Sequence, residues 1–239
     1  ETSKTCYSSF QKMLNEDRID LFFLGDFNEV EILENLKNFP LTGRKETVNI
    51  QYRQEYSNVL REGIIRRNLG QSILEMGYHS TIGYGDDQKM ALLLVNGLLG
   101  AFPHSKLFTQ VREKEGLAYT VSSHLDLFSG FLRLFAGINR QDRNRVRKLM
   151  NDQLFDIKNS RFTDAEINQT KEMIRRNMLL CQDNQDSIID REYLTLFFGK
   201  SVLDLETLIE KLEQVDKDAI CKAASSLKLQ AIYFMEGAE

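Results

Sequence analysis

The segment at 87–102, DQKMALLLVNGLLGAF, limits the folds open to this chain more than any other part of the sequence. It follows a turn-forming stretch that contains Gly83 and Gly85, and Pro103 ends it. As a helix it would be apolar nearly all round rather than along one stripe, so it must be covered on every side. We therefore expect a buried helix here, with the rest of the chain packed around it.

The elements expected around this helix are strands bunched in the middle of the chain and helices bunched late. Alternating or apolar patterns predict strands at 47–52 and 71–80, a hairpin from 118–128 and 131–138 around Ser129–Gly130, and a closing strand at 230–236. Helical spacing covers 143–159, 187–200 and 215–227, and Thr163 and Glu166 form a capping box that opens another helix. This order indicates an α+β fold, a mainly antiparallel sheet with helices packed on one face.

The first part of the chain predicts a helix, a strand and a second helix. The helix at 8–20 leads into an apolar strand at 19–26 that ends in a Gly-Asp turn, and Asn28 is the expected N-cap of a helix at 28–39. Pro40 and Gly43 then interrupt the pattern. We place a domain boundary at residue 44.

Bulk composition excludes several classes of protein. A net charge of -4 and a pI near 5.6 give no basic face for nucleic acid. The longest apolar run, 91–95, is too short to span a bilayer, so no membrane role is expected. Three widely separated cysteines without a CxxC pair indicate reduced thiols in the cytoplasm. The chain shows no signal peptide and begins with Glu1, so we expect a piece of a longer protein.

Most catalytic motifs are missing from the sequence. His79, His104 and His124 are isolated from one another, and neither HExxH nor HxxEH occurs, so we expect no metal site in this chain. There is no GxSxG elbow, and GYGDD at 83–87 lacks the spacing of a phosphate-binding loop.

Arg112 and Tyr119 remain as candidate site residues. A helix at 106–115, capped by Ser105 and stopped by Gly116, carries Arg112 in its last turns, and Tyr119 opens the following strand. A helix end and a strand start can direct two side chains into one cavity. The residues alone favour a surface ion pair from Arg112 to Glu113 or Glu115, with Tyr119 an ordinary strand aromatic.

The central third of the chain resembles the M16 family of zinc metallopeptidases, which includes insulin-degrading enzyme, pitrilysin and the mitochondrial processing peptidases. The matching pieces are the apolar helix, then SKLF at 105–108, REKEGLAY at 112–119 and a hairpin closing in AGI at 136–138. Upstream, DLFFLGDFNEVEILENL resembles the strand, turn and helix that close the family's first half-repeat, so the likeness extends over nearly the whole chain.

This resemblance implies a domain plan and a function. Residues 1–44 would be the helix–strand–helix tail of a preceding half-repeat, and 45–239 a second M16-like α+β domain. Arg112 would bind a backbone carbonyl of a peptide substrate, and Tyr119 would donate to the oxyanion formed from the scissile carbonyl. Because HxxEH is missing, zinc and its ligands would belong to a partner domain or subunit.

The family resemblance leaves the role of the chain open in one respect. The sequence looks most like the non-catalytic bacterial members, and we expect the substrate-binding, C-terminal half of a peptide-processing system with an active M16 partner. The alternatives are a non-enzymatic M16-like scaffold and a module that captures peptides by strand addition.

Overall fold

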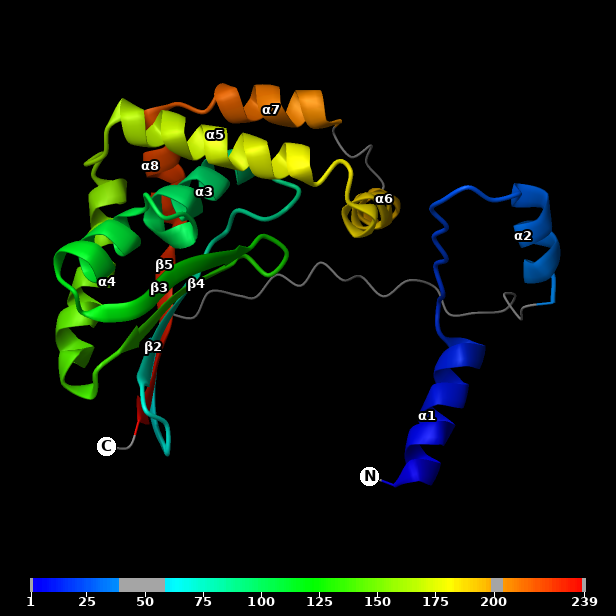
Figure 1. Cartoon of the computed structure of the whole chain (residues 1–239), viewed down its shortest axis with the longest axis horizontal. Coiled ribbons are helices and arrows are strands. Elements are labelled where there is room, and N and C mark those ends of the chain that lie inside the picture. The colour runs from blue at the N-terminus through cyan, green and yellow to red at the C-terminus, as the bar shows by residue number, and fades with distance from the viewer. Residues whose placement is uncertain (1, 39–58, 199–203, 238–239) are drawn as a thin grey trace. The chain divides into compact units, whose positions relative to one another are not determined.

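The computed structural model describes residues 2–38, 59–198 and 204–237, which form two compact units (Figure 1). The first unit contains 2–38 and 183–198, and the second contains 59–182 and 204–237. The strand predicted at 47–52 and the domain boundary predicted at residue 44 lie outside the described residues.

One sheet runs through the second unit. Its strands are β1 (Arg61–Arg67), β2 (Ser72–His79), β3 (Ala118–Asp126), β4 (Phe131–Ile138) and β5 (Lys228–Gly237), in the order β1-β5-β2-β4-β3. β1 pairs with β5 in parallel, and the other neighbouring pairs are antiparallel. The first and last strands of the unit are therefore neighbours at one side of the sheet, and the predicted α+β fold with a mainly antiparallel sheet is confirmed.

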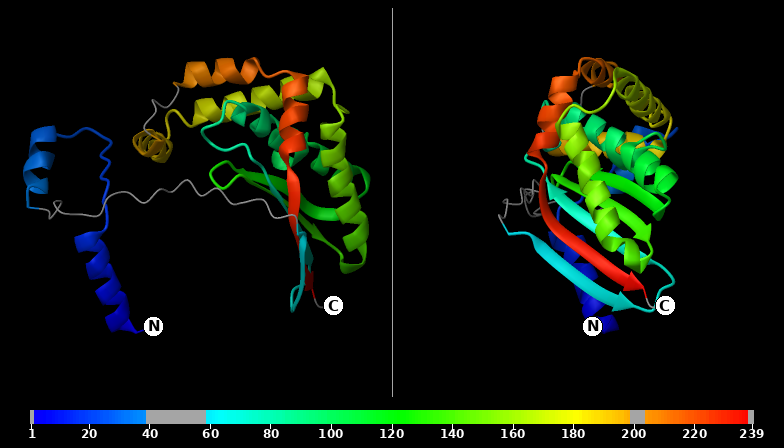
Figure 2. Two further views of the ribbon diagram at one scale, coloured as in Figure 1. Left: turned by 180° about the vertical axis from the view of Figure 1, so that it is seen from behind. Right: turned by 90° about the vertical axis from the view of Figure 1, so that its left-hand side faces the viewer.

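Helices cover one face of this sheet (Figure 2). α3 (Lys89–Asn96) with its continuation η1 (Gly97–Ala101) and α4 (Arg143–Lys158) contact the sheet, and α8 (Lys217–Ser226) packs on α3 and α4. α5 (Asp164–Leu180) and α7 (Leu205–Glu213) pack on α3. Alternate residues of each central strand point toward these helices, as Leu132, Leu134 and Ala136 of β4 do, and all three are fully buried. The core of the unit lies between the two layers.

The apolar helix predicted at 87–102 is buried, as expected. Leu92, Leu94, Val95 and Leu99 have no exposed surface. The helix widens to π geometry at Gly97, and a Cβ added to Gly100 would lie 2.7 Å from the backbone nitrogen of Ser123 on β3. The small residue lets this helix approach the sheet more closely than any side chain would allow.

The predicted caps were right in two cases and wrong in one. Thr163 and Glu166 form the capping box of α5, and Asn28 Oδ1 accepts from the Val30 amide at the start of α2. Ser105 does not cap its helix. Its hydroxyl is buried without a partner among the described residues, and the Thr109 amide bonds to the Ser105 carbonyl instead.

The first unit has a different character. It contains α1 (Ser3–Glu16), α2 (Glu29–Leu36) and α6 (Gln185–Phe198), and neither α1 nor α2 buries a residue. The strand predicted at 19–26 is wrong for the described residues, where the segment pairs with no strand and Phe22 packs edge-on against Tyr193 at 5.9 Å between ring centroids. The apolar pattern indicates an extended chain, but a strand also needs a partner, which a local pattern does not supply.

Candidate functional site

Tyr119 occupies an irregular position in β3. The β3–β4 ladder pairs Ala118 with Ile138 and Thr120 with Gly137, so Tyr119 is the extra residue of a β-bulge. A bulge redirects a side chain and is frequent beside active sites. The side chain of Tyr119 accordingly projects into solvent, and the residue is 61% exposed.

The phenol of Tyr119 is held by one polar neighbour. Its hydroxyl donates to Asn139 Oδ1 at 3.1 Å, and Asn139 Nδ2 donates to Asp142 Oδ2 at 3.3 Å. Asn139 directly follows β4, and Asp142 ends the short 3-10 helix η3 (Arg140–Asp142). Sequence reasoning missed Asn139, and the only available signal was its position immediately after AGI.

Arg112 lies on η2 (Phe108–Lys114), a segment of π-helix. Its guanidinium carbon lies 4.7 Å from the centroid of the Phe108 ring. This cation–π contact orients the N–H donors of the guanidinium. Arg112 is exposed, and it forms no ion pair within the part of the chain that is described. Glu115, one of the partners considered from the sequence, bonds to Arg145 instead.

The turn between η2 and β3 links the two candidate residues. Gly116 adopts a φ of +63°, as its predicted position after the helix requires, and the Leu117 amide donates to the Val111 carbonyl at 3.0 Å. The chain thus passes from helix to strand within three residues. No hydrogen bond or ion pair of the described residues joins Arg112 to Tyr119.

The three histidines are spread over the second unit and do not form a metal site. His79 ends β2 and is nearly buried, His124 is exposed on β3, and His104 Nε2 lies 2.9 Å from Thr170 Oγ1. Burial lowers the pKa of His104, and the nearby Glu166 carboxylate partly opposes this. Within residues 2–38, 59–198 and 204–237, no three His, Cys, Asp or Glu side chains are grouped as metal ligands, so these residues do not fit a zinc ion.

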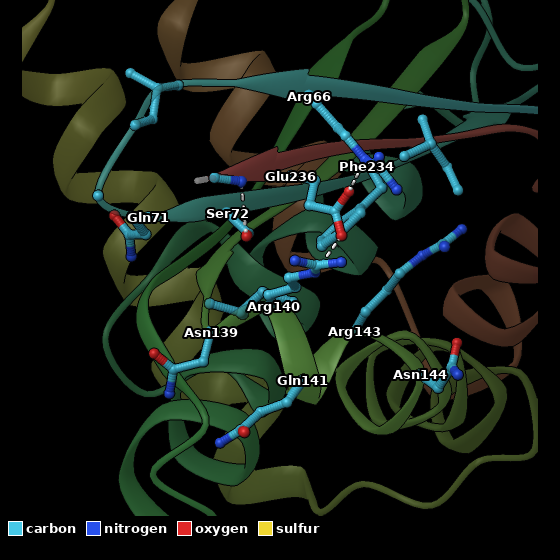
Figure 3. A pocket seen from close by; sticks show the side chains of 15 residues that line it. Arg66, Gln71, Ser72, Asn139, Arg140, Gln141, Arg143, Asn144, Phe234 and Glu236 are labelled. Atoms are coloured by element: carbon cyan, nitrogen blue, oxygen red, sulfur yellow. Dashed lines mark hydrogen bonds and ion pairs between the residues drawn. The ribbon is translucent and has the colours of Figure 1, made fainter. Parts of the chain in front are cut away.

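A hollow of about 730 Å³ lies beside Asn139, at the end of the sheet (Figure 3). Its polar walls include Arg66, Arg140, Arg143 and Glu236. Hydrogen bonds, first from Arg66, lower the pKa of the Glu236 carboxyl, with the charges of Arg140 and Arg66 adding to the effect. No sequence pattern predicts this hollow, because its walls come from six separate elements and the loops between them.

Comparison with known proteins identifies the family. Residues 2–174 match the sequence profile of the family described as "Peptidase M16 inactive domain". The chain belongs to the M16 family. The residues of this M16 chain that match include both Arg112 and Tyr119.

The relatives of this M16 chain include proteins named as inactive. It is 30% identical over 240 residues to "Probable inactive metalloprotease YmfF" of Bacillus subtilis. This match covers 100% of this chain and 56% of the relative. A conserved protein from Enterococcus faecalis matches with a TM-score of 0.95 and 40% identity, over 100% of this chain and 56% of its own. The peptidase M16 inactive domain from Pseudomonas fluorescens matches over 87% of this chain and 50% of its own, with a TM-score of 0.70 and 18% identity, which shows the fold alone.

The chain therefore spans a little over half the length of its first relatives. The match to the inactive domain agrees with the missing HxxEH motif, and the domain is of the non-catalytic type. No helix among the described residues combines the length and apolar character needed to cross a membrane.

Proposed function

We propose that this chain is the C-terminal, substrate-binding half of a bacterial M16-type peptidase system, acting on peptides together with a catalytic M16 domain or subunit. The observation that carries the proposal is the exposed phenol of Tyr119, displaced from the regular ladder by a bulge, within a chain of the M16 family. A surface aromatic with only a packing role needs neither the bulge nor the polar neighbour.

Tyr119 is suited to donate a hydrogen bond to a peptide carbonyl. Its hydroxyl can turn its proton from Asn139 Oδ1 to an oxygen on which negative charge develops. One such donor is worth about 3 kcal/mol in a water-excluded site. Asn139 keeps the phenol in one orientation before the substrate arrives.

Arg112 is suited to hold a fixed acceptor. Its guanidinium is permanently charged, it is stacked on Phe108, and it has no carboxylate partner within the described ranges. We assign it to a backbone carbonyl of the bound peptide. Holding the peptide backbone there would position the scissile bond relative to Tyr119.

The zinc of such a system would be supplied by the catalytic partner, because the histidines of this chain do not fit the metal. The part of this chain in the reaction is to bind and orient the peptide and to hold the developing charge. We also propose a cytoplasmic location, supported by three free cysteines, of which Cys6 and Cys181 are exposed.

The test is to combine the full-length protein that contains this chain with an M16 subunit of the same organism that carries HxxEH, and to measure cleavage of a fluorogenic peptide library. Tyr119→Phe is expected to lower kcat roughly 100-fold with little change in KM, since the donor acts on charge that develops only in the transition state. Tyr7→Phe is a matched control, because Tyr7 is 65% exposed on α1 and belongs to the other unit.

An unchanged turnover number in Tyr119→Phe would overturn the proposed role. If no peptide is cleaved with any HxxEH subunit, and peptides do not bind, the chain would be a scaffold instead. Peptide binding without cleavage, unaffected by Tyr119→Phe and Arg112→Lys, would point to capture by strand addition.

A further inference from the structure

The hollow at the end of the sheet has a positive balance of charge. Arg66 on β1, Arg140 on η3 and Arg143 at the start of α4 line it, against the single carboxylate of Glu236 on β5 (Figure 3). Glu236 bonds to both Arg66, at 2.7 Å, and Arg140. Three positive charges against one negative charge leave a net charge of +2 in the walls.

Arg143 is the cation of this group that has no counter-ion. Its guanidinium carbon lies 4.9 Å from the centroid of the buried Phe234 ring, and no carboxylate of the described residues lies within ion-pairing distance. Asp142 already supplies negative charge at the N-cap position of α4, so Arg143 is the group left for an anion to pair with. An anion in the hollow would complement this arginine.

One hydrogen-bond donor of the hollow is also unused. Arg143 Nε is buried without a partner among the described residues, and buried donors rarely stay unpaired. This orphan group is a donor, so the missing partner is an acceptor.

The hollow has apolar walls as well. Ile64 and Leu69 line it and are 55% and 42% exposed, and buried Ile138 and Phe234 form its floor. A free phosphate ion would use the donors and leave this apolar surface in water. A carboxylate attached to an apolar group would use both, and a hollow of about 730 Å³ is of the size that takes such a ligand.

We infer that the hollow binds the free C-terminal carboxylate of a peptide whose last residue is apolar, with Arg143 as the cation that takes the carboxylate. This inference rests on the proposed function, because the hollow adjoins the assigned peptide site. Asn139 forms part of its wall and also accepts the hydrogen bond from the Tyr119 phenol at 3.1 Å. A peptide with its C-terminal carboxylate in the hollow could therefore have its preceding residues beside Tyr119.

The experiment is a titration of the full chain with pairs of short peptides that end in Leu, one with a free acid and one with a C-terminal amide. The free acid is expected to bind roughly ten-fold or more tightly than the amide, the difference made by a charge-assisted hydrogen bond. Arg143→Gln should abolish this preference, and Arg143→Lys should keep part of it. Arg145→Gln removes the same charge two residues along α4, outside the hollow, and should keep all of it.

Equal affinity for acid and amide would overturn the inference, as would a preference that persists in Arg143→Gln with an unchanged melting temperature. Inorganic phosphate is the third probe, and binding of phosphate without discrimination between the two peptides would assign the hollow to a phosphate ligand and overturn the peptide assignment. Binding needs no partner subunit or turnover, so this result is independent of the effect of Tyr119→Phe on kcat. If the chain prefers the free acid but Tyr119→Phe leaves kcat unchanged, the proposed role of Tyr119 fails while the assignment of the hollow stands.

Discussion

The Tyr119 hydroxyl lies 3.1 Å from Asn139 Oδ1, so the side chain that a bulge pushes out of β3 is held by the residue that directly follows β4. Asn139 is held in turn by Asp142, which fixes the amide oxygen toward the phenol. This relay gives the exposed tyrosine one preferred position, and it leads to the first prediction.

Asn139→Ala is expected to lower kcat of the reconstituted system several-fold, because the phenol loses its fixed orientation. A double-mutant cycle tests whether Asn139 acts through Tyr119. If it does, Asn139→Ala costs nothing further in a Tyr119→Phe background. Additive losses in kcat would show instead that Asn139 acts independently of the phenol.

Arg112→Lys is expected to raise KM roughly ten-fold with a smaller change in kcat. Lysine keeps the charge but loses the rigid fork of donors and the flat stack on Phe108. Steady-state kinetics on one peptide measures both constants. Arg176→Lys on α5, where Arg176 pairs with Glu172, is the matched control, and an equal rise in KM there would remove the special role of Arg112.

Gly100→Ala is expected to destabilise the second unit by about 1–3 kcal/mol, because the added methyl group would overlap the backbone of Ser123 on β3. Chemical unfolding followed by circular dichroism gives the free energy of unfolding. Gly85→Ala is the control, since no atom lies within 4 Å of an added Cβ there. The close packing of η1 on β3 would be wrong if both variants unfolded alike.

Stability should fall as the pH drops below about 6.5, and His104 should account for part of the loss. Burial lowers the pKa of His104 in the folded chain, so the unfolded chain binds more protons between the two pKa values and gains stability relative to the folded chain. His104→Gln is expected to flatten the pH dependence of the unfolding free energy between about pH 7.5 and pH 5.5. A slope equal to that of the unsubstituted chain would contradict the assignment to His104.

Local patterns were sufficient for much of the fold. The helix predicted at 143–159 is α4 at Arg143–Lys158, and the closing strand predicted at 230–236 lies within β5. In both, side chains that face the core recur at the period of the element, so the sequence itself carries the signal. The same holds for the Thr163–Glu166 capping box, where four consecutive residues contain the whole interaction.

Non-local pairing could not be predicted. β1 was missed because its residues, REGIIRR, are exposed or half-buried, and because its partner β5 lies at the other end of the unit. The hollow was missed for the same reason, since the register of β1, β4 and β5 brings Arg66, Arg140 and Glu236 together. Arg112 and Tyr119 could be recognised from the sequence because one short motif contains both. Their action on one substrate stays a prediction.

The bulge at Tyr119 has a consequence for how this residue is inherited. Because Thr120 already pairs with Gly137 and Ala118 with Ile138, a chain lacking the intervening tyrosine would close into an ordinary ladder without disturbing the layers beneath. Loss or gain of this residue during evolution would therefore leave the rest of the fold unchanged. The fold does not require Tyr119, so only the function of the protein would conserve it.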